Sequence, residues 1–356
     1  MLRDSFEDLR AAVWGADLLV THTMTFAGPI VAACEGIPWA SAVLAPASLM
    51  SRFDPPVLSQ APWMSRLRPL GPRFHGPVLR HGMALAGRWV PEVDQLRADL
   101  GLPPGDNPLG DGQHAPGCVL ALFSGVLGVP QADWPPQAVQ TGFPFLDAPQ
   151  PETDPDLERF LDAGDPPVVF TLGSSAVHDA GRFYAESLDA ARRVGRRAVL
   201  IVGPDPRNRL RGRLPSWAFE AGYADHGSLF PRAWAVVHHG GVGTTAQGLR
   251  AGKPMLVVPY TFDQFDNADR VVRLGLAASI SSRRYNASRS ARGLGRLAEP
   301  GCQERAARIG RAVRAEDGVE TACRRLDALI ASRGAGAPAR SANPRWRTWA
   351  RPGGRD

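Results

Sequence analysis

The sequence predicts an α/β protein with parallel sheets in two domains. A length of 356 residues is enough for two domains. In the first half, strands are expected at 17–22 and 39–44 with a helix at 26–35 between them, which is a βαβ arrangement. In the second half, almost continuous apolar strands alternate with helix-length segments. Such strands are typical of parallel sheets that helices cover on both faces.

The first domain is expected to span residues 1–143. Residues 52–112 are rich in proline and in scattered apolar side chains, so they suit short helices and loops, either over an apolar cleft or in simple packing. Strand signals return at 118–123 and 139–142. Residues 144–155 are rich in proline and acidic side chains, and we predict that they form a linker between the domains.

The second domain is expected to span residues 156–331. We predict that residues 332–356 form a disordered basic tail. The expected strands are 167–173, 198–203, 234–239 and 254–259, and the expected helices are 180–194, one that ends at Gly252, 267–274 and 303–330, the last with a weak point at Gly318.

Composition argues against several classes of protein. The chain begins with charged residues and has no apolar run of about 20 residues, so we expect a cytoplasmic protein without a transmembrane segment. Peripheral contact with a membrane stays possible. About +5 of the net charge of +6 follows Ser332, which argues against a nucleic-acid partner. The four cysteines lie far apart, and no carboxylate or histidine cluster has ligand spacing, so we expect neither disulfides nor a metal.

A glycine-rich turn follows the expected strand at 234–239. Gly240, Gly241 and Gly243 allow backbone amides to approach a ligand closely. A helix follows the turn, and its N-terminus favours phosphate. The spacing fits neither a dinucleotide fingerprint nor a P-loop, since the glycine after Gly243 is Gly248 and Lys253 precedes a proline. The turn therefore predicts a diphosphate site of another type.

The chain resembles glycosyltransferase family 1, the UDP-glycosyltransferase type, and its bacterial macrolide- and sterol-glucosyltransferase-like members. The motifs that carry the resemblance are HHGGVGTT at 238–245 followed by the DQ pair at 263–264, with further matches at TLGSS 171–175, YADHGSLFPRA 223–233, TGFPF 141–145 and DLLVTH 17–22. The resemblance implies a GT-B fold of two Rossmann-like, doubly wound domains, the first binding an acceptor and the second the donor. It also implies inverting transfer of a hexose from a UDP-sugar, a co-substrate rather than a cofactor, to a hydroxyl of a hydrophobic small molecule, which could be a natural product, a sterol or a lipid-like compound.

The resemblance also assigns residues to the donor. His239 matches the histidine that contacts the donor phosphate, and a neutral imidazole can donate one hydrogen bond. The amides and hydroxyl of Gly240, Gly241, Gly243 and Thr244 are expected around the same diphosphate. Asp263 and Gln264 are expected to bind sugar hydroxyls, with capping of the next helix as the alternative.

Four further assignments depend on substituted or less specific positions. Tyr223 stands where plant relatives have a tryptophan that stacks on uracil, and His226 stands at their glutamine. Gln247 occupies the position of a glutamate that holds the ribose. Ser174 follows a strand beside the cradle and is expected to touch the nucleotide, with capping of the next helix as the alternative.

The catalytic base is not found among the matched residues. Family members carry it on a GxxGHxxP-like turn after the first strand, which this sequence lacks. DLLVTH corresponds to a point well inside the usual first domain, so roughly 90 residues of the family pattern are unmatched, and a sheet without its first strands has an exposed edge. His22 stands where relatives have the aspartate that orients the base, and it is a candidate base or a simple strand-end residue.

Three functions therefore stay open. The first is an inverting glycosyltransferase, and the second is a truncated, catalytically silent protein that binds UDP-sugar. A sugar-nucleotide epimerase is less attractive, because the DQ pair follows the cradle at the spacing of a transferase. The sequence does not identify the acceptor, the transferred sugar or the oligomeric state.

Overall fold

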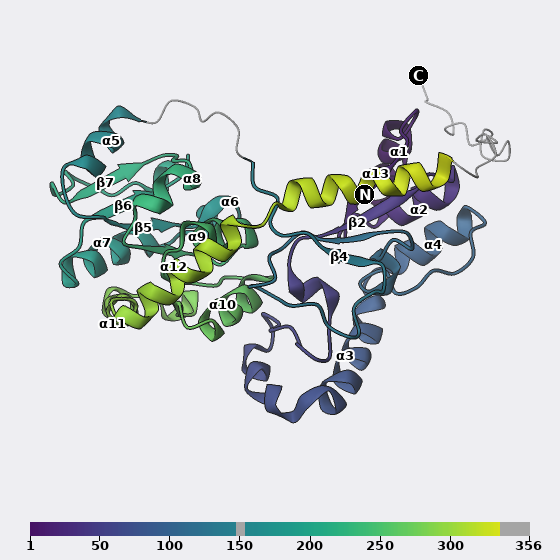
Figure 1. Ribbon diagram of the computed structural model, residues 1–356, viewed down its shortest axis with the longest axis horizontal. Coiled ribbons are helices and arrows are strands. Elements are labelled where there is room, and N and C mark those ends of the chain that lie inside the picture. The colour runs from purple at the N-terminus through teal and green to yellow at the C-terminus, as the bar shows by residue number, and fades with distance from the viewer. Residues whose placement is uncertain (147–153, 335–356) are drawn as a thin grey trace, which may run out of the picture.

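A computed structural model of the chain describes residues 1–146 and 154–334, without the side chains of residues 174, 175, 333 and 334 (Figure 1). The described residues form two parallel sheets that lie at opposite ends of the view. The first sheet has the order β1-β2-β3-β4, with β1(Leu19–His22), β2(Trp39–Val43), β3(Val119–Ala121) and β4(Ala138–Gln140). β1 is an edge strand, and its Val20 side chain is exposed.

Three helices cover one side of the first sheet around an apolar cluster that contains Phe6, Ile30, Val31, Val93 and Leu96. These helices are α1(Leu2–Ala12), α2(Ala27–Glu35) and α4(Pro91–Asp99). Between them in the chain, η2(Pro62–Leu70) and α3(Gly71–Gly87) form a helical hairpin that projects below the first sheet in Figure 1. The region does consist of helices and loops, but the expectation that its helices are short was wrong for α3, which has 17 residues.

The second sheet has the order β10-β9-β8-β5-β6-β7, and all its strand pairs are parallel. This is the order of a dinucleotide-binding-type doubly wound sheet, in which the winding direction reverses between the first and fourth strands. Here those strands are β5 and β8. The strands are β5(Val168–Thr171), β6(Ala198–Ile201), β7(Ala218–Ala221), β8(Ala235–His238), β9(Met255–Val257) and β10(Ala277–Ser279).

Alternation along the strands of the second sheet creates two apolar layers. Val169, Val199 and Val236 point to one face, whereas Phe170 and Val237 point to the other. Helices cover both faces, as expected for strands apolar on both sides. The helices are α5(Pro155–Asp162), α6(Gly173–Ala176), α7(Phe183–Arg193), α8(His226–Leu229), α9(Val242–Ala251), α10(Gln264–Arg273), α11(Ala287–Leu297) and α12(Pro300–Arg314), and the remaining short turns are η1(Pro46–Leu49), η3(Asp111–Gln113), η4(Val177–Asp179), η5(Pro206–Asn208), η6(Phe230–Arg232) and η7(Ser282–Arg284).

The last helix, α13(Gly318–Gly334), returns to the first sheet (Figure 1). Its Ala322, Leu326 and Leu329 pack with Cys118 and Leu120, because an apolar stripe at helical spacing covers an open face of the sheet. The sequence placed this helix in the second domain and began the tail at 332. The helix instead packs on the first domain and continues to Gly334.

The predicted weak point at Gly318 is confirmed, because α12 ends at Arg314 and α13 starts at Gly318. A side chain at Gly318 would collide with the backbone of Phe143. Two expected helix starts were wrong by three residues each, since α7 begins at Phe183 and α10 at Gln264. Residues 147–153 of the expected linker and 335–356 of the expected tail lie outside the described residues.

The expectations about a transmembrane segment and about a metal site concern features that can be searched for in the described part of the chain. Within 1–146 and 154–334, no helix is long and apolar enough to cross a membrane. Over the same ranges, no three His, Cys, Asp or Glu side chains come close enough together to hold a metal ion.

Candidate functional site

The expected site residues gather at the carboxyl ends of β5 and β8. These strands are neighbours with Thr171 opposite His238, and the chain leaves them in opposite directions. The crevice at such a reversal is where doubly wound sheets bind ligands. β5 leads into Gly173 and α6, while β8 leads into His239 and the glycine turn.

The glycine turn is held at Gly240 by hydrogen bonds on both sides of the residue. Its N–H donates to Nδ1 of His238 over 3.1 Å, and its carbonyl accepts from Nδ2 of Asn267 over 3.0 Å. Gly240 has φ of +92°, and a Cβ there would lie 2.8 Å from Val257. Only glycine fits this position.

The imidazole of His239 fills the space between two glycines. A Cβ on Gly173 or on Gly241 would lie within 3.0 Å of the ring. The glycine at 173 therefore makes room for a side chain from the neighbouring strand. Burial lowers the pKa of His239 to about 4, with a smaller contribution from His226 in the same direction. His239 is thus neutral at pH 7 and can donate a single hydrogen bond.

The N-terminus of α9 opens beside His239. Gly241 is its N-cap, and the first-turn amides of an α-helix have no acceptor within the helix. A Cβ on Gly243 would meet nothing within 4 Å, so the first turn faces open space. Thr244 is buried in this turn, and the hydroxyl of Thr245 donates to the carbonyl of Gly241 over 3.0 Å. The arrangement offers several N–H donors and a helix dipole to an anion.

The expected sugar-binding pair lies at the start of α10. Oδ2 of Asp263 accepts from Nδ2 of Asn267 over 2.8 Å, so the same amide holds Asp263 and Gly240. Asp263 is the N-cap of α10 but makes no capping hydrogen bond. Oε1 of Gln264 accepts from the amides of Tyr260 and Thr261 over 2.8 and 3.1 Å, so this oxygen is used within the protein.

His22, at the end of β1 in the first domain, lies near Asp263 of the second. Burial raises the pKa of Asp263, while the hydrogen bond from Asn267 and the charge of His22 act in the opposite direction. Nδ1 of His22 accepts from the amide of Met24 over 3.2 Å, so the neutral ring carries its proton on Nε2. In this tautomer Nε2 is a donor and not a base.

Of the remaining expected residues, His226 is close enough to His239 to affect its pKa. His226 stacks on Phe230 with ring centroids 4.4 Å apart, and burial lowers its pKa although Asp225 opposes the shift. Tyr223 is 73% exposed. Gln247 is half-buried on α9. Ser174 lies in α6, and its side chain is outside the described part of the structure.

A charged network joins the two domains next to the donor side. Arg68 pairs with Asp54 at 2.6 Å and with Asp269 at 3.1 Å. Arg270 is buried between Asp54 and Asp266, and the amide of Val57 donates to Asp266 over 3.0 Å. Burial acts to raise the pKa of Asp54, but the charges of Arg270, Arg273 and Arg68 outweigh it and lower the pKa.

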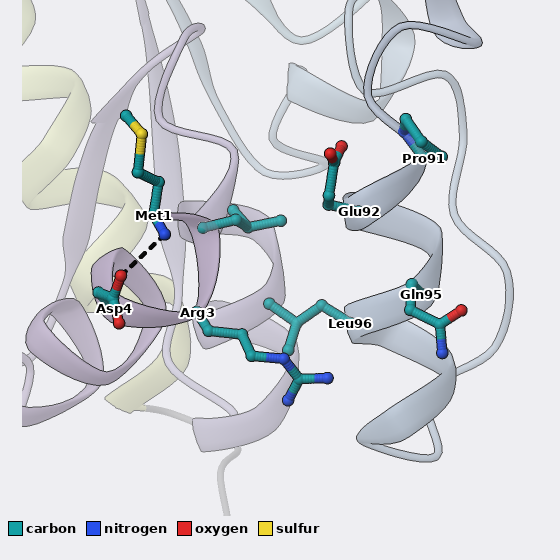
Figure 2. A pocket seen from close by; sticks show the side chains of 8 residues that line it. Met1, Arg3, Asp4, Pro91, Glu92, Gln95 and Leu96 are labelled. Carbon is teal, nitrogen blue, oxygen red and sulfur yellow. Dashed lines mark ion pairs between the residues drawn. The ribbon is translucent and has the colours of Figure 1, made fainter.

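Two adjoining cavities lie between α1 and α4, away from the cradle. The first, of about 580 Å³, is lined by Leu2, Arg3, Glu92 and Leu96 among others, and Figure 2 shows α1 and α4 on its two sides. The second, of about 600 Å³, reaches Met24, Thr25 and Phe26, just after His22. These cavities lie on the first domain, where the resemblance places the acceptor.

Sequence reasoning missed three residues that shape the cradle. It gave no role in the cradle to Gly173, His238 or Asn267. His238 packs at the strand end, with Nε2 3.3 Å from the sulfur of Met255, and its Nδ1 also holds Gly240. The spacing of Asn267 from Asp263, one helical turn, was the signal that could have revealed the amide.

Comparison with known sequences gives relatives of one kind. The family model described as "Erythromycin biosynthesis protein CIII-like, C-terminal domain" matches residues 185–322. O-mycaminosyltylonolide 6-deoxyallosyltransferase of Streptomyces fradiae is 39% identical over 266 residues, which are 72% of this chain and 61% of that protein. Vancomycin aglycone glucosyltransferase of Amycolatopsis orientalis is 32% identical over 284 residues, 77% of this chain and 65% of that protein. The chain thus spans less than two thirds of the length of these curated relatives.

Solved structures share the fold at lower identity. Spinosyn forosaminyltransferase SpnP has a TM-score of 0.65 and 19% identity, with 92% of this chain and 79% of that chain covered. Glycosyltransferase VinC, solved in complex with dTDP, has a TM-score of 0.61 and 22% identity, with 92% and 76% covered. The predicted GT-B architecture is confirmed by these neighbours.

Proposed function

Because the chain belongs to glycosyltransferase family 1, we propose that it transfers a hexose from a nucleoside-diphosphate sugar to a hydroxyl group of a hydrophobic small molecule. The observation that carries this proposal is the cradle at the strand reversal. There, His239, the glycine turn and the N-terminus of α9 converge on one space. Neutral N–H donors and a helix dipole are suited to a diphosphate.

The reaction would be a single displacement at the sugar carbon. The acceptor oxygen attacks C1 and its proton passes to a base, the bond from C1 to the diphosphate oxygen breaks, and the diphosphate leaves toward the cradle. The cradle would stabilise the charge that develops on this leaving group. Asp263 lies between the cradle and the first domain, so its carboxylate would accept hydrogen bonds from the sugar hydroxyls.

The donor base is proposed to be a pyrimidine. The sequence predicts UDP, and two structural neighbours were solved with thymidine diphosphate. The exposed ring of Tyr223 supports stacking of either base. UDP-sugars and dTDP-sugars should therefore be tested side by side.

A second candidate function, donor binding without transfer, is supported by His22. The lone pair on its Nδ1 already accepts from the amide of Met24, so it is not available to take a proton from an acceptor. A transferase needs a base that takes the acceptor proton.

Product analysis separates the two functions. The chain would be incubated with UDP- and dTDP-hexoses and a panel of hydrophobic alcohols, and both free nucleoside diphosphate and the glycoside would be quantified by mass spectrometry. The proposal predicts equal amounts of the two products, with loss of both in the His239→Ala variant. Donor binding without either product would support the second function, and a changed sugar without acceptor would indicate an epimerase.

A further inference from the structure

The hairpin formed by η2 and α3 is unusual in how little of it is buried. In α3 only His75 and Gly76 are buried, and η2 has no buried residue. The hairpin is nevertheless anchored, because the ring of His75 hydrogen-bonds the carbonyl of Leu67 at 2.9 Å and Asn107 donates to the carbonyl of Met83 over 2.7 Å. A well-defined helix therefore presents most of its surface to the outside.

The charged side chains of this hairpin are all positive. Residues 55–90 contain five arginines and no aspartate or glutamate. Arg68 turns inward to Asp54 and Asp269. The other four, Arg66, Arg73, Arg80 and Arg88, are exposed, and none of them forms an ion pair with another described residue.

Basic and apolar side chains share one face of α3. Arg73, Arg80 and Arg88 recur at intervals of seven and eight residues, which places them on the same side of a helix. Phe74 and Leu85 are exposed next to them, and His81 lies between them. We call these six residues the basic α3 face. Trp63 and Trp89, near the two ends of the hairpin, are 59% and 75% exposed.

We propose that the basic α3 face docks on a membrane surface that contains anionic lipid. A helix with arginines beside exposed aromatic and leucine side chains is suited to lie at a bilayer interface. Exposed tryptophans prefer the same interface. Residues 55–90 contain no acidic side chain, so no carboxylate in this segment would be repelled by the negative charge of an anionic membrane.

This inference adds a location to the proposed function but does not depend on it. The hairpin belongs to the first domain, where a hydrophobic acceptor is expected. Docking there would bring the enzyme to the phase in which apolar molecules concentrate. Binding to vesicles can be measured without any sugar nucleotide, so failure of the one proposal is distinguishable from failure of the other.

Vesicle co-sedimentation of the full chain tests the proposal. The protein is mixed with phosphatidylcholine vesicles, with or without an equal share of phosphatidylglycerol, at low and at high salt. Binding is expected only with phosphatidylglycerol, and salt should weaken it because screening shortens the range of the attraction. Replacement of Arg66, Arg73, Arg80 and Arg88 by Gln should lower the partition coefficient about 600-fold, since each charge near the surface contributes roughly fivefold.

Two further variants test whether vesicle binding depends on the basic α3 face or only on the total positive charge of the protein. Replacement of Arg283, Arg292, Arg296 and Arg308 by Gln removes the same charge from exposed positions on the second domain, and binding should stay within about twofold of wild type. The Phe74→Ser, Leu85→Ser variant keeps every charge and should bind at least about fivefold more weakly. Both four-arginine variants should retain their melting temperature.

Three results would overturn the proposal. The first is no sedimentation with phosphatidylglycerol vesicles at low salt. The second is equal loss in both four-arginine variants, which would assign binding to overall charge, including the arginines after Gly334. The third is equal binding to vesicles without anionic lipid.

Discussion

At the residue scale, His239 combines burial with a site for an anion. Its ring is 4% exposed and is enclosed by Gly173 and Gly241. Burial disfavours the imidazolium, so the ring stays neutral over the pH range in which a diphosphate is fully ionised. The site therefore relies on N–H donors and the dipole of α9 rather than on a formal positive charge.

The low pKa of His239 predicts how stability depends on pH. The pKa is about 4 in the folded protein and about 6.5 in the unfolded chain, so between these values the unfolded chain binds more protons. The contribution of the neutral His239 to the free energy of unfolding is therefore fully present above pH 6.5, and it is lost as the pH falls toward 4. Because of His239, the free energy of unfolding should fall by roughly 2 kcal/mol from pH 7 to pH 5.

Urea unfolding at pH 7 and pH 5 measures this contribution. In the His239→Gln variant the loss of stability between the two values should be smaller by roughly 2 kcal/mol than in wild type. Replacement of the exposed His81 by Gln should leave the pH dependence as it is in wild type. An identical pH dependence in wild type and His239→Gln would show that burial of the ring is not the cause.

Asn267 links Gly240 of the proposed phosphate side to Asp263 of the proposed sugar side. Its amide donates to Gly240 and to Asp263, and its side chain is fully buried. We predict that Asn267→Ala weakens binding of a nucleoside-diphosphate sugar by about 10- to 100-fold, because a buried carbonyl and a carboxylate each lose a donor. Isothermal titration calorimetry gives the affinity.

Asn208 provides a matched control for this variant. It is also buried, and its amide donates to the carbonyls of Val177 and Val202 over 2.8 and 2.9 Å. Asn208→Ala should lower the unfolding midpoint as Asn267→Ala does, while the affinity for the donor changes less. Equal losses of affinity in the two variants would mean that general destabilisation, not coupling of Gly240 and Asp263, explains the effect.

At the scale of elements, the first turn of α10 contributes residues to the candidate site, and its next two turns contact the first domain. Arg270 lies buried between Asp266 and Asp54, whereas Arg273 pairs with Asp269 from a half-exposed position. Arg270→Met should cost roughly 3–5 kcal/mol, because two carboxylates would lose their buried partner. Arg273→Met should cost less than about 1 kcal/mol, as expected for an exposed pair.

The midpoint of thermal unfolding, followed by circular dichroism, compares the two arginine variants. Both remove one charge and leave an apolar side chain of similar length. A similar small decrease in both would show that the network at α10 contributes little to the attachment of the two domains.

The elements differ in how well the sequence predicted them. The apolar strands β5, β6 and β8 were recognisable because every residue in them is buried. β7 and β10 were missed, since they carry partly exposed side chains at the sides of the sheet. The glycine turn and α9 were predictable from Gly240 and Gly252, whose positive φ angles other residues rarely adopt.

At the scale of the whole molecule, the two domains could be predicted, but the contacts between them could not. Nothing local in the sequence around Ala322 and Leu329 shows that α13 packs on the first sheet, because the apolar stripe fits any open apolar face. The pairing of Asp54 with Arg270 joins positions 216 residues apart. Likewise, the proximity of His22 to Asp263 depends on how the first sheet meets α10.

The central claim is that the cradle at the reversal between β5 and β8 binds the diphosphate of a sugar nucleotide. Calorimetric titration of the full chain with UDP and with dTDP tests it most directly. The account predicts saturable binding of at least one of them, weakened at least about tenfold in Gly173→Val, because that side chain displaces the ring of His239. Gly195 has a similar φ of +63° but no atom within 4 Å of an added Cβ, so Gly195→Ala controls for backbone strain and should bind as wild type does. No binding of either nucleotide, or equal binding by Gly173→Val and wild type, would contradict the account.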